Sequence, residues 1–155
     1  VDSSREMLAI ARAELDEASG AQVELRCADA YRLPVATNAA DLVTVHQVLH
    51  YLTDPDRALA EAVRILSPEG VLLIADFAPH DHEFLREEHA HRRLGVAAQE
   101  LSQWAASAGG VVQDVMTLAP HIDLKPDAEP RLPGLTVTIW KVGKAAIAAA
   151  ARGTP

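Results

Sequence analysis

Apolar residues recur every three or four positions in four stretches of the chain, a spacing typical of helices that bury one face. Signals at the helix ends agree with this spacing. Ser3 and Glu6 form a capping box before the first helix, and Gly20 follows its end. Asp54 is expected to cap the second helix, with Pro55 in its first turn. The expected helices cover residues 5–19, 55–66, 83–94 and 98–107.

Alternating or continuous apolar runs predict strands between and after these helices. Residues 67–70, Ser-Pro-Glu-Gly, are expected to form a turn. Strands and helices alternate until the last two strands, which follow one another and should pair antiparallel. This order predicts an α/β fold with a Rossmann-like, doubly wound, mostly parallel sheet and an antiparallel hairpin at its C-terminal edge. The expected strands cover residues 23–27, 42–45, 71–75, 111–118 and 135–142.

The pattern indicates one domain followed by a tail. Residues 1–142 carry the periodic segments, whereas residues 143–155 are rich in alanine, have little to bury and are expected to be flexible. The 155 residues, 49% of them hydrophobic and 23% charged, suffice for a hydrophobic core and exclude wholesale disorder. The first residues show no basic stretch followed by an apolar run, so a cytoplasmic location is expected.

The net charge of the chain disfavours some classes of binding partner. Fourteen Lys and Arg residues against 22 Asp and Glu give a net charge of −8, which repels the phosphates of nucleic acids and anionic membranes. We therefore expect no direct nucleic-acid contact, no membrane binding and a small molecule as partner. Cys27 is the only cysteine, which excludes an internal disulfide and a multi-thiolate metal site.

Polar residues follow the expected strands at the points where they end. Ligands of open α/β sheets bind outside the carboxyl ends of the strands, so these residues are candidates for a binding site. Two carboxylates suit a nucleoside, because one can bind the ribose hydroxyls and the other an adenine amine. The alternative is that acids at these positions only cap the next helix. The polar residues are Asp2, after a strand expected to end at Val1, and Asp29, His46, Gln47 and Asp76; Phe77 follows Asp76.

Histidines concentrate in residues 79–93, which hold four of the seven. Imidazole and carboxylate groups together would suit zinc or another divalent ion. His89 and His91 are two positions apart, so a helix would point them to different faces, which argues against a shared metal. The preferred interpretation is a helix that closes over a substrate pocket. The pocket residues would be Phe77, His80 and Phe84.

Four segments resemble, in order, motifs of class I S-adenosylmethionine-dependent methyltransferases. Residues 1–12, VDSSREMLAIAR, are similar to V-D-x-S-x-E-M-L-x-x-A-R, and residues 28–34, ADAYRLP, to (G/A)-D-x-x-x-L-P. Residues 41–52 contain D-L-V and V-L-H-Y-L, similar to D-x-V and V-L-H-H-L. Residues 64–70, RILSPEG, resemble R-x-L-x-P-G-G, with Glu69 replacing the first glycine. The match runs in register over residues 1–77.

A narrower resemblance covers residues 76–95. It is to methyltransferase domains fused behind an ArsR-type winged helix, and it implies a DNA-binding part that would precede this chain. The family's Gly-rich loop would also precede Val1, because none of the eight glycines comes before Gly20. The resemblance therefore implies an N-terminally truncated domain, lacking its first strand and Gly-rich loop. The chain would then be a fragment of a larger methyltransferase, or would need a partner to supply the missing strand. A fused N-terminal winged-helix domain or a second copy of the chain is the partner considered; an alternative start codon or a processed end at Val1 stays open.

The resemblance also implies a cofactor, S-adenosyl-L-methionine, and residues to bind it. Asp2 would hold the ribose hydroxyls. Asp29 would accept from the adenine amine, with Ala30 beside it. His46 and Gln47 would line the reactive end of the cofactor.

Two further residues have open alternatives. Met7 would pack near the adenine, or it is an ordinary core methionine at helical spacing. His50 is a candidate catalytic base, since its pKa is ordinarily near 6.5; the alternative is a packed histidine without a proton role. Methyl transfer depends mainly on positioning the two reactants, so one essential catalytic residue need not exist.

The preferred function is S-adenosylmethionine-dependent methyl transfer to a small-molecule acceptor. By resemblance the acceptor would be a quinone-like carbon or another small molecule, and arsenic is disfavoured because several thiols would be needed. The alternative is a non-catalytic part of an ArsR-type transcriptional regulator that senses a metabolite or a metal. A metal-sensing form would need the histidines of residues 79–93.

Overall fold

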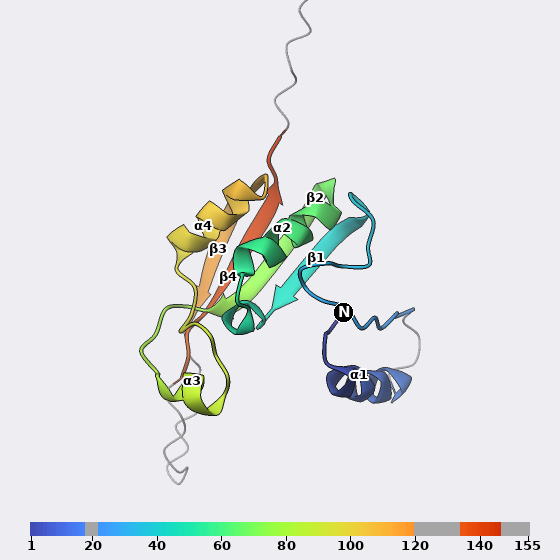
Figure 1. Ribbon diagram of the computed structural model, residues 1–155. Coiled ribbons are helices and arrows are strands. Elements are labelled where there is room, and N and C mark those ends of the chain that lie inside the picture. The colour runs from blue at the N-terminus through green and yellow to red at the C-terminus, as the bar shows by residue number, and fades with distance from the viewer. Residues whose placement is uncertain (18–21, 120–133, 147–155) are drawn as a thin grey trace, which may run out of the picture.

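The computed structural model describes residues 1–17, 22–119 and 134–146 (Figure 1). A four-stranded sheet forms its centre, and short helices precede, follow and connect the strands. No helix in these ranges is both long and apolar enough to cross a bilayer. In chain order the elements are α1 (Arg5–Glu17), β1 (Ala40–His46), the 3-10 helix η1 (Leu49–Tyr51), α2 (Pro55–Ile65), β2 (Leu66–Phe77), α3 (Phe84–Glu88), α4 (Ala98–Ser107), β3 (Gly110–Leu118) and β4 (Val137–Lys144).

The strands lie in the order β1-β2-β4-β3. β1 and β2 are parallel, with Val43 opposite Leu72 and Val45 opposite Ile74. β4 pairs antiparallel with both β2 and β3. The predicted α/β fold and its C-terminal antiparallel pair are confirmed. The sheet formed by the described strands is mixed, because one of its three strand pairs is parallel and two are antiparallel.

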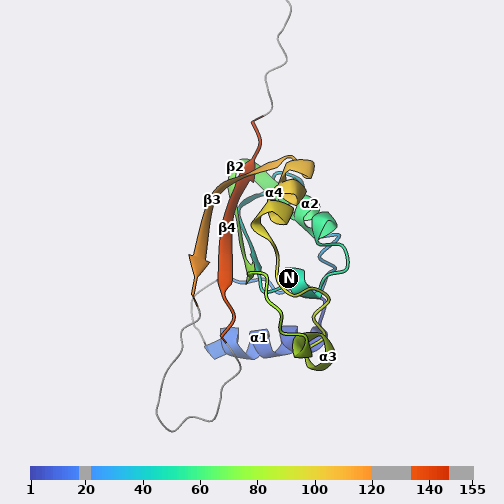
Figure 2. The same cartoon turned by 90° about the vertical axis from the view of Figure 1, so that its left-hand side faces the viewer.

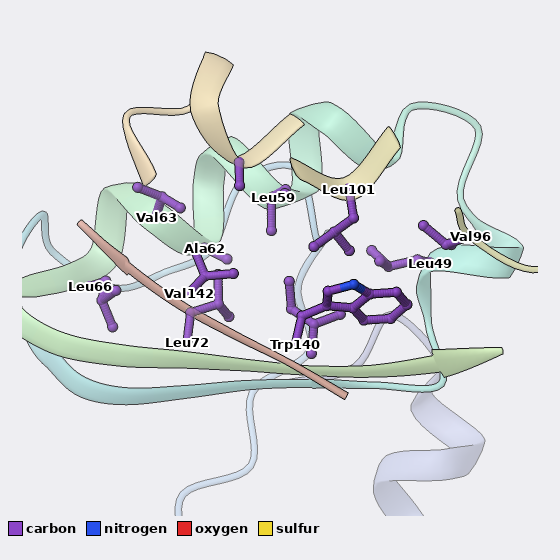
Figure 3. Close-up of a cluster of buried hydrophobic side chains, with 12 residues drawn as sticks. Leu49, Leu59, Ala62, Val63, Leu66, Leu72, Val96, Leu101, Trp140 and Val142 are labelled. Atoms are coloured by element: carbon purple, nitrogen blue, oxygen red, sulfur yellow. The ribbon is translucent and has the colours of Figure 1, made fainter. Parts of the chain in front are cut away.

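The hydrophobic core lies between one face of the sheet and helices α2 and α4, which cover that face in Figure 2. Trp140 of β4 is fully buried against Leu101 of α4, Leu59 of α2 and Leu72 of β2 (Figure 3). The alternation of strand residues explains this arrangement, since every second residue of β2 and β4 points to the same side. On the opposite face none of the described helices packs, and Leu42 is 59% and Met116 56% exposed.

The start of the chain differs from the prediction in three respects. Ser4 rather than Ser3 caps α1, because its Oγ accepts a hydrogen bond from the amide of Met7 at 3.2 Å. Met7 is 53% exposed and Leu8 is the buried residue of this turn, so Met7 is not a core methionine. The strand predicted over residues 23–27 is reduced to one parallel bridge between Cys27 and Asp2. Without a longer partner, alternating residues alone do not make a strand.

The turn predicted at residues 67–70 lies within β2. Its residues fall where the register with β1 shifts, between the pairs Ala40–Leu66 and Leu42–Val71. Extra residues on one strand at such an irregularity have no partner on the opposite strand. A proline is tolerated there because its missing N–H is not needed for strand pairing. The strand therefore begins at Leu66 rather than at Val71.

The helix predicted over residues 83–94 ends at Glu88. Two residues later Ala90 takes a positive φ of 55°, which turns the chain out of the helical path. The amides of His89 and His91 both donate to the carbonyl of Leu85, at 3.2 and 3.1 Å, and close the last turn. The chain folds back towards η1 instead, where the amide of Arg92 donates to the carbonyl of His50 at 2.8 Å.

The other predicted elements are confirmed, or they fall on residues that the structure does not describe. The second helix begins at Pro55 as expected, although the side chain of Asp54 makes no capping hydrogen bond. The helix at 98–107 is confirmed, and the last strand extends two residues past its predicted end to Lys144. Most of the alanine-rich tail, residues 147–155, and the proline-rich loop between the last two strands fall outside the described residues.

Candidate functional site

The two predicted nucleoside-binding carboxylates come from chain segments that pair with each other. The amide of Asp2 donates to the carbonyl of Arg26 at 3.2 Å, and the amide of Ala28 donates to the carbonyl of Asp2 at 3.1 Å. Asp29 follows directly in the sequence. The start of the chain lies on the side of the sheet where β1 and β2 end (Figure 1). The structure thus brings Asp2 and Asp29 together near the edge at which ligands of α/β sheets bind.

Both carboxylates also make local hydrogen bonds. Oδ1 of Asp2 accepts from the amide of Ser4 at 2.7 Å, and Oδ1 of Asp29 accepts from the amide of Tyr31 at 2.9 Å. Both side chains are exposed, and in the described part of the chain Oδ2 of each has no further hydrogen bond. Capping and ligand binding are therefore compatible, since one oxygen fixes the side chain and the other faces solvent.

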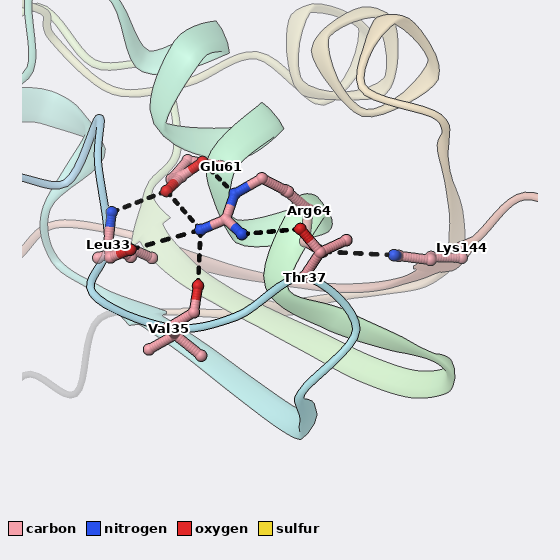
Figure 4. A network of polar contacts seen from close by, with 6 residues as sticks. All are labelled: Leu33, Val35, Thr37, Glu61, Arg64 and Lys144. Atoms are coloured by element: carbon pink, nitrogen blue, oxygen red, sulfur yellow. Dashed lines mark hydrogen bonds and ion pairs between the residues drawn. The ribbon is translucent and has the colours of Figure 1, made fainter.

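The loop that follows Asp29 is held against α2 by an ion pair (Figure 4). Oε1 of Glu61 accepts from the amide of Leu33 at 2.7 Å, and Oε2 pairs with Nε of Arg64 at 2.7 Å. Arg64 also donates to the carbonyl of Val35 at 2.9 Å and to Oγ1 of Thr37 at 3.0 Å. Its guanidinium lowers the pKa of the Glu61 carboxyl. We call this group, Leu33, Val35, Thr37, Glu61 and Arg64, the loop clamp.

A second contact fixes the same loop from the other end of α2. The hydroxyl of Tyr31 accepts a hydrogen bond from the amide of Asp54 at 3.1 Å. The guanidinium of Arg57 lies over the Tyr31 ring, 5.1 Å from its centroid, within the range of a cation–π contact. The loop carrying Asp29 and Ala30 is thus attached to both ends of one helix.

The residues after β1 have an unusual backbone. His46 is exposed at the end of the strand. Gln47 has a positive φ of 54°, a backbone conformation that residues other than glycine rarely adopt. Its amide nitrogen donates to the carbonyl of Ala75 at 2.8 Å, whereas its side-chain Oε1 is buried and has no partner among the described residues. A strained residue with an unsatisfied buried oxygen is typical of ligand-binding positions.

His50 and Asp76 form a buried pair at the ends of η1 and β2. Nδ1 of His50 lies 2.7 Å from Oδ1 of Asp76, and the side chains are 2% and 0% exposed. Asp76 also accepts from the amide of Leu49 at 2.8 Å and from that of Phe77 at 2.8 Å. Because Nδ1 is bonded to the carboxylate, Nε2 is the nitrogen that can exchange a proton with a ligand.

Aromatic rings surround His50. Its ring centroid lies 4.1 Å from that of Tyr51, 4.2 Å from His91 and 4.9 Å from Phe77. Phe77 and His91 are stacked, with an interplanar angle of 16°. His91 is 7% exposed, whereas Tyr51 is 46% exposed and forms the solvent side of the group. We call His50, Tyr51, Phe77 and His91, together with the adjoining His80, the ring cluster.

The three predicted pocket residues do not all meet. His80 contacts Phe77 edge-on, with 6.1 Å between the ring centroids. Phe84 contacts His82 and His89 instead, at 6.0 and 6.2 Å, and so lies outside the ring cluster. Burial, followed by neighbouring histidines, lowers the pKa of both His80 and His91. Within the described ranges, no three His, Cys, Asp or Glu side chains are grouped closely enough to hold a metal ion.

Sequence reasoning missed several residues of this site. His91 was considered only as a metal ligand, and Tyr51 not at all. Glu61 and Arg64 are three positions apart on α2, a spacing typical of ion pairs, which was an available signal. Asp76 was recognised at a strand end, but its pairing with His50 needed the three-dimensional structure.

A family model described as a methyltransferase domain matches residues 1–74. The match covers α1, β1, α2 and most of β2, and therefore the segments that carry Asp2, Asp29 and His50. The match ends before Phe77, His80 and His91 of the ring cluster.

Curated relatives include methyltransferases. A 37.1 kDa protein in a transposon of Streptomyces fradiae is 32% identical over 130 residues, which is 76% of this chain and 37% of that protein. The ubiquinone/menaquinone biosynthesis C-methyltransferase of Shewanella halifaxensis is 33% identical over 87 residues, which is 56% of this chain and 35% of that enzyme. The chain thus spans little more than a third of the length of these relatives.

Solved structures show the same fold. A candidate methyltransferase from Bacillus halodurans superposes with a TM-score of 0.76 at 16% identity, covering 93% of this chain and 81% of that one. A SAM-dependent methyltransferase from Thermotoga maritima gives a TM-score of 0.67 at 25% identity, covering 92% and 71%. The fold is the Rossmann-like fold of class I methyltransferases. The chain is thus similar in sequence to methyltransferases over residues 1–74, and it shares their fold.

Proposed function

We propose that the chain takes part in methyl transfer from S-adenosylmethionine to a small-molecule acceptor. The observation that carries the proposal is the pairing of the Asp2 segment with the segment that leads to Asp29, at the side of the sheet where β1 and β2 end. Two carboxylates on adjacent segments are suited to a nucleoside, as the sequence predicted. The bound cofactor would supply a methyl group attached to a sulfonium sulfur. The neutral thioether that remains after transfer is a good leaving group.

The residues present fit this cofactor. Asp2 would bind the ribose hydroxyls through Oδ2, and Asp29 would accept from the adenine amine in the same way, with Ala30 at its side. Met7, exposed on the first turn of α1, would cover the adenine. The buried, unpartnered Oε1 of Gln47 would accept a hydrogen bond from the polar end of the cofactor, with His46 beside it.

The acceptor would be bound by the ring cluster. His50 would take a proton from the acceptor at Nε2, while Asp76 holds the opposite nitrogen and keeps the ring in one orientation. Phe77 and His80 would contact the acceptor, whereas Phe84 contacts His82 and His89 instead of the ring cluster. A histidine oriented by a carboxylate is a common arrangement for a general base.

Calorimetric titration with S-adenosylhomocysteine tests the proposal. We expect Asp2→Ala and Asp29→Ala each to weaken binding by roughly fivefold to 100-fold, the effect of losing a charge-assisted hydrogen bond. Asp56→Ala is the matched control, because this exposed acid lies in the first turn of α2 and outside the site. Equal affinity in all four proteins would refute the assignment of both carboxylates.

The regulatory alternative makes a different prediction. A sensor part of an ArsR-type regulator would bind S-adenosylhomocysteine or another metabolite without turning over S-adenosylmethionine. Assay of methyl transfer in the longest natural form of the protein separates the two. Cytoplasmic location, the absence of nucleic-acid and membrane contact, and an N-terminal winged-helix or self partner remain predictions. The flexible tail predicted for residues 143–155 also remains a prediction, except that Gly143 and Lys144 belong to β4.

A further inference from the structure

His91 is held in place by a highly constrained segment. The amides of Arg92 and Arg93 both donate to the carbonyl of His50, at 2.8 and 3.3 Å, so the segment is attached to the residue that His91 covers. Ala90 enters the segment with a φ of 55°. Gly95 leaves it with a φ of 84°, at a position where a Cβ would lie 2.2 Å from the carbonyl oxygen of Ala78. This conformation places His91 against His50 and Phe77.

Two imidazole nitrogens of the ring cluster have no partner. Nδ1 of His91 and Nε2 of His80 are buried and make no hydrogen bond to any described residue. His91 is 93% buried, since 7% of its surface is exposed. An unsatisfied buried polar atom is unfavourable, and native proteins usually satisfy such atoms with a partner, a water molecule or a ligand. Phenylalanine would have filled the same space without this penalty.

We propose that Nδ1 of His91 binds a hydroxyl group carried on an aromatic ring, with His80 as the second unpartnered imidazole of the ring cluster, and that such compounds are the acceptor class of this site. A neutral imidazole has one donor and one acceptor nitrogen, and a hydroxyl group both donates and accepts. An ammonium group would only donate, and a carboxylate would only accept. Burial lowers the pKa of both histidines, which favours their neutral form, and the rings of Phe77, Tyr51 and His50 give the site an aromatic lining.

The inference rests on the proposed function and names the acceptor that His50 would deprotonate. Groups facing His91 come from every element around it. They are His50 and Tyr51 of η1, Asp76 and Phe77 of β2, and His80 and His89 from the segments on either side of α3. Asp76 is already satisfied by three donors, so it does not compete for the ligand hydroxyl. Tyr51, 46% exposed, is the member of the ring cluster that faces solvent.

Equilibrium dialysis of the full chain against three nitroaromatic probes tests the inference. The probes are 4-nitrophenol, 4-nitroanisole and 4-nitrobenzylamine, which share a ring and differ in the polar group. We expect 4-nitrophenol to bind at least about tenfold more tightly than the other two, as for one well-made hydrogen bond in a buried site. Equal binding of the three probes, or none by any, would overturn the inference.

Two single substitutions test whether His91 is responsible for the preference for 4-nitrophenol. His91→Phe keeps a ring but removes the nitrogens, and should lower 4-nitrophenol affinity about tenfold. His89→Phe, two residues away and exposed, should leave it unchanged. An unchanged affinity in His91→Phe overturns the inference. If His91→Phe fails to fold, histidine ¹⁵N shifts of the unmodified chain decide, because the probe must move those of His80 and His91 and not that of His89.

Titration with S-adenosylhomocysteine on the same sample separates this inference from the proposed function. Binding of 4-nitrophenol without binding of S-adenosylhomocysteine would support the hydroxyl site and contradict the cofactor assignment. Binding of S-adenosylhomocysteine without preference for 4-nitrophenol would overturn the acceptor class and leave methyl transfer standing.

Discussion

Oδ1 of Asp76 lies 2.7 Å from Nδ1 of His50, and the carboxylate is fully buried. Its remaining hydrogen bonds come from the amides of Leu49 and Phe77, so that one side chain orders η1, the end of β2 and the imidazole ring. A buried carboxylate is tolerable here because three donors replace its hydration. The pair thus links the next-to-last residue of β2 to the candidate base.

Replacing Asp76 by Asn should destabilise the protein strongly. The Asn amide nitrogen would face one of the three donors, leaving a buried N–H without an acceptor. We expect the free energy of unfolding to fall by about 2–4 kcal/mol, measured by urea denaturation. Asp41→Asn is the control: this exposed acid accepts from Ser67 at 3.0 Å, and its loss should cost under about 0.5 kcal/mol. Equal losses would contradict a special role for the buried pair.

The loop clamp should determine the mobility of the loop that carries Asp29. In Arg64→Ala the Glu61 carboxylate loses its ion pair, and the carbonyl of Val35 and the hydroxyl of Thr37 lose a donor. We expect amide hydrogen exchange at Leu33 to become about tenfold faster, as for the loss of one stabilising hydrogen bond.

Arg12→Ala serves as the control for this experiment, since Arg12 is exposed on α1 and forms no ion pair with a described residue. Arg64→Lys should recover only part of the protection, because an ammonium cannot reproduce the forked contacts of a guanidinium. Unchanged exchange at Leu33 in Arg64→Ala would show that the loop is held by other contacts, such as that of Tyr31 with Asp54.

Two glycines with similar backbone conformations should respond differently to substitution. Gly95 has a φ of 84°, and an added Cβ would lie 2.2 Å from the carbonyl oxygen of Ala78. Gly109 has a φ of 79°, but a Cβ there would meet nothing within 4 Å. Gly109→Ala should therefore cost only the strain of a positive φ, about 1 kcal/mol, whereas Gly95→Ala adds a clash with backbone and should cost more than about 2 kcal/mol.

Thermal or urea unfolding of both variants measures this difference. Gly95→Ala should in addition release the segment that holds His91, which would expose the amides of Arg92 and Arg93 to hydrogen exchange. Similar losses in the two variants would mean that the segment adjusts to the added methyl group.

The elements that sequence alone predicted well are those whose residues bury one side. The amphipathic faces of α2 and α4 and the apolar runs in β1, β2 and β4 have few alternatives in water. Two of the predictions that failed concern residues 23–27 and 83–94. In both segments the local pattern was correct but the outcome depended on contacts distant in sequence, namely a partner for the strand and the attachment of Arg92 to His50.

The candidate site divides in the same way. Strand ends are predictable from the sequence, so Asp2, Asp29 and Gln47 could be named as candidates before the structure. The ring cluster was not, because His50, Phe77 and His91 come from three separate segments, and the sequence does not reveal that their rings stack. The positive φ of Gln47 likewise has no signature in its side chain.

The buried histidines should make stability depend on pH in a direction that can be derived. Burial lowers the folded-state pKa of His80 and His91 below the ordinary value of 6.5. Below that value the unfolded chain takes up protons that the folded chain does not, so the folded state loses stability as the pH falls from the unfolded pKa towards the folded one. Above about pH 7 their contribution to stability is fully present, because both states are then unprotonated.

Urea unfolding at about pH 7.5 and about pH 5 measures the effect, and the comparison of variants isolates it. Lowered carboxyl pKa values, such as that of Glu61, also reduce stability in acid, so the whole protein alone is not diagnostic. His91→Phe cannot take up a proton at this position in either state, and its stability should fall less between the two pH values than that of the unmodified chain. His89→Phe should fall as much as the unmodified chain, and a His91→Phe variant with the full loss would place the acid sensitivity outside the ring cluster.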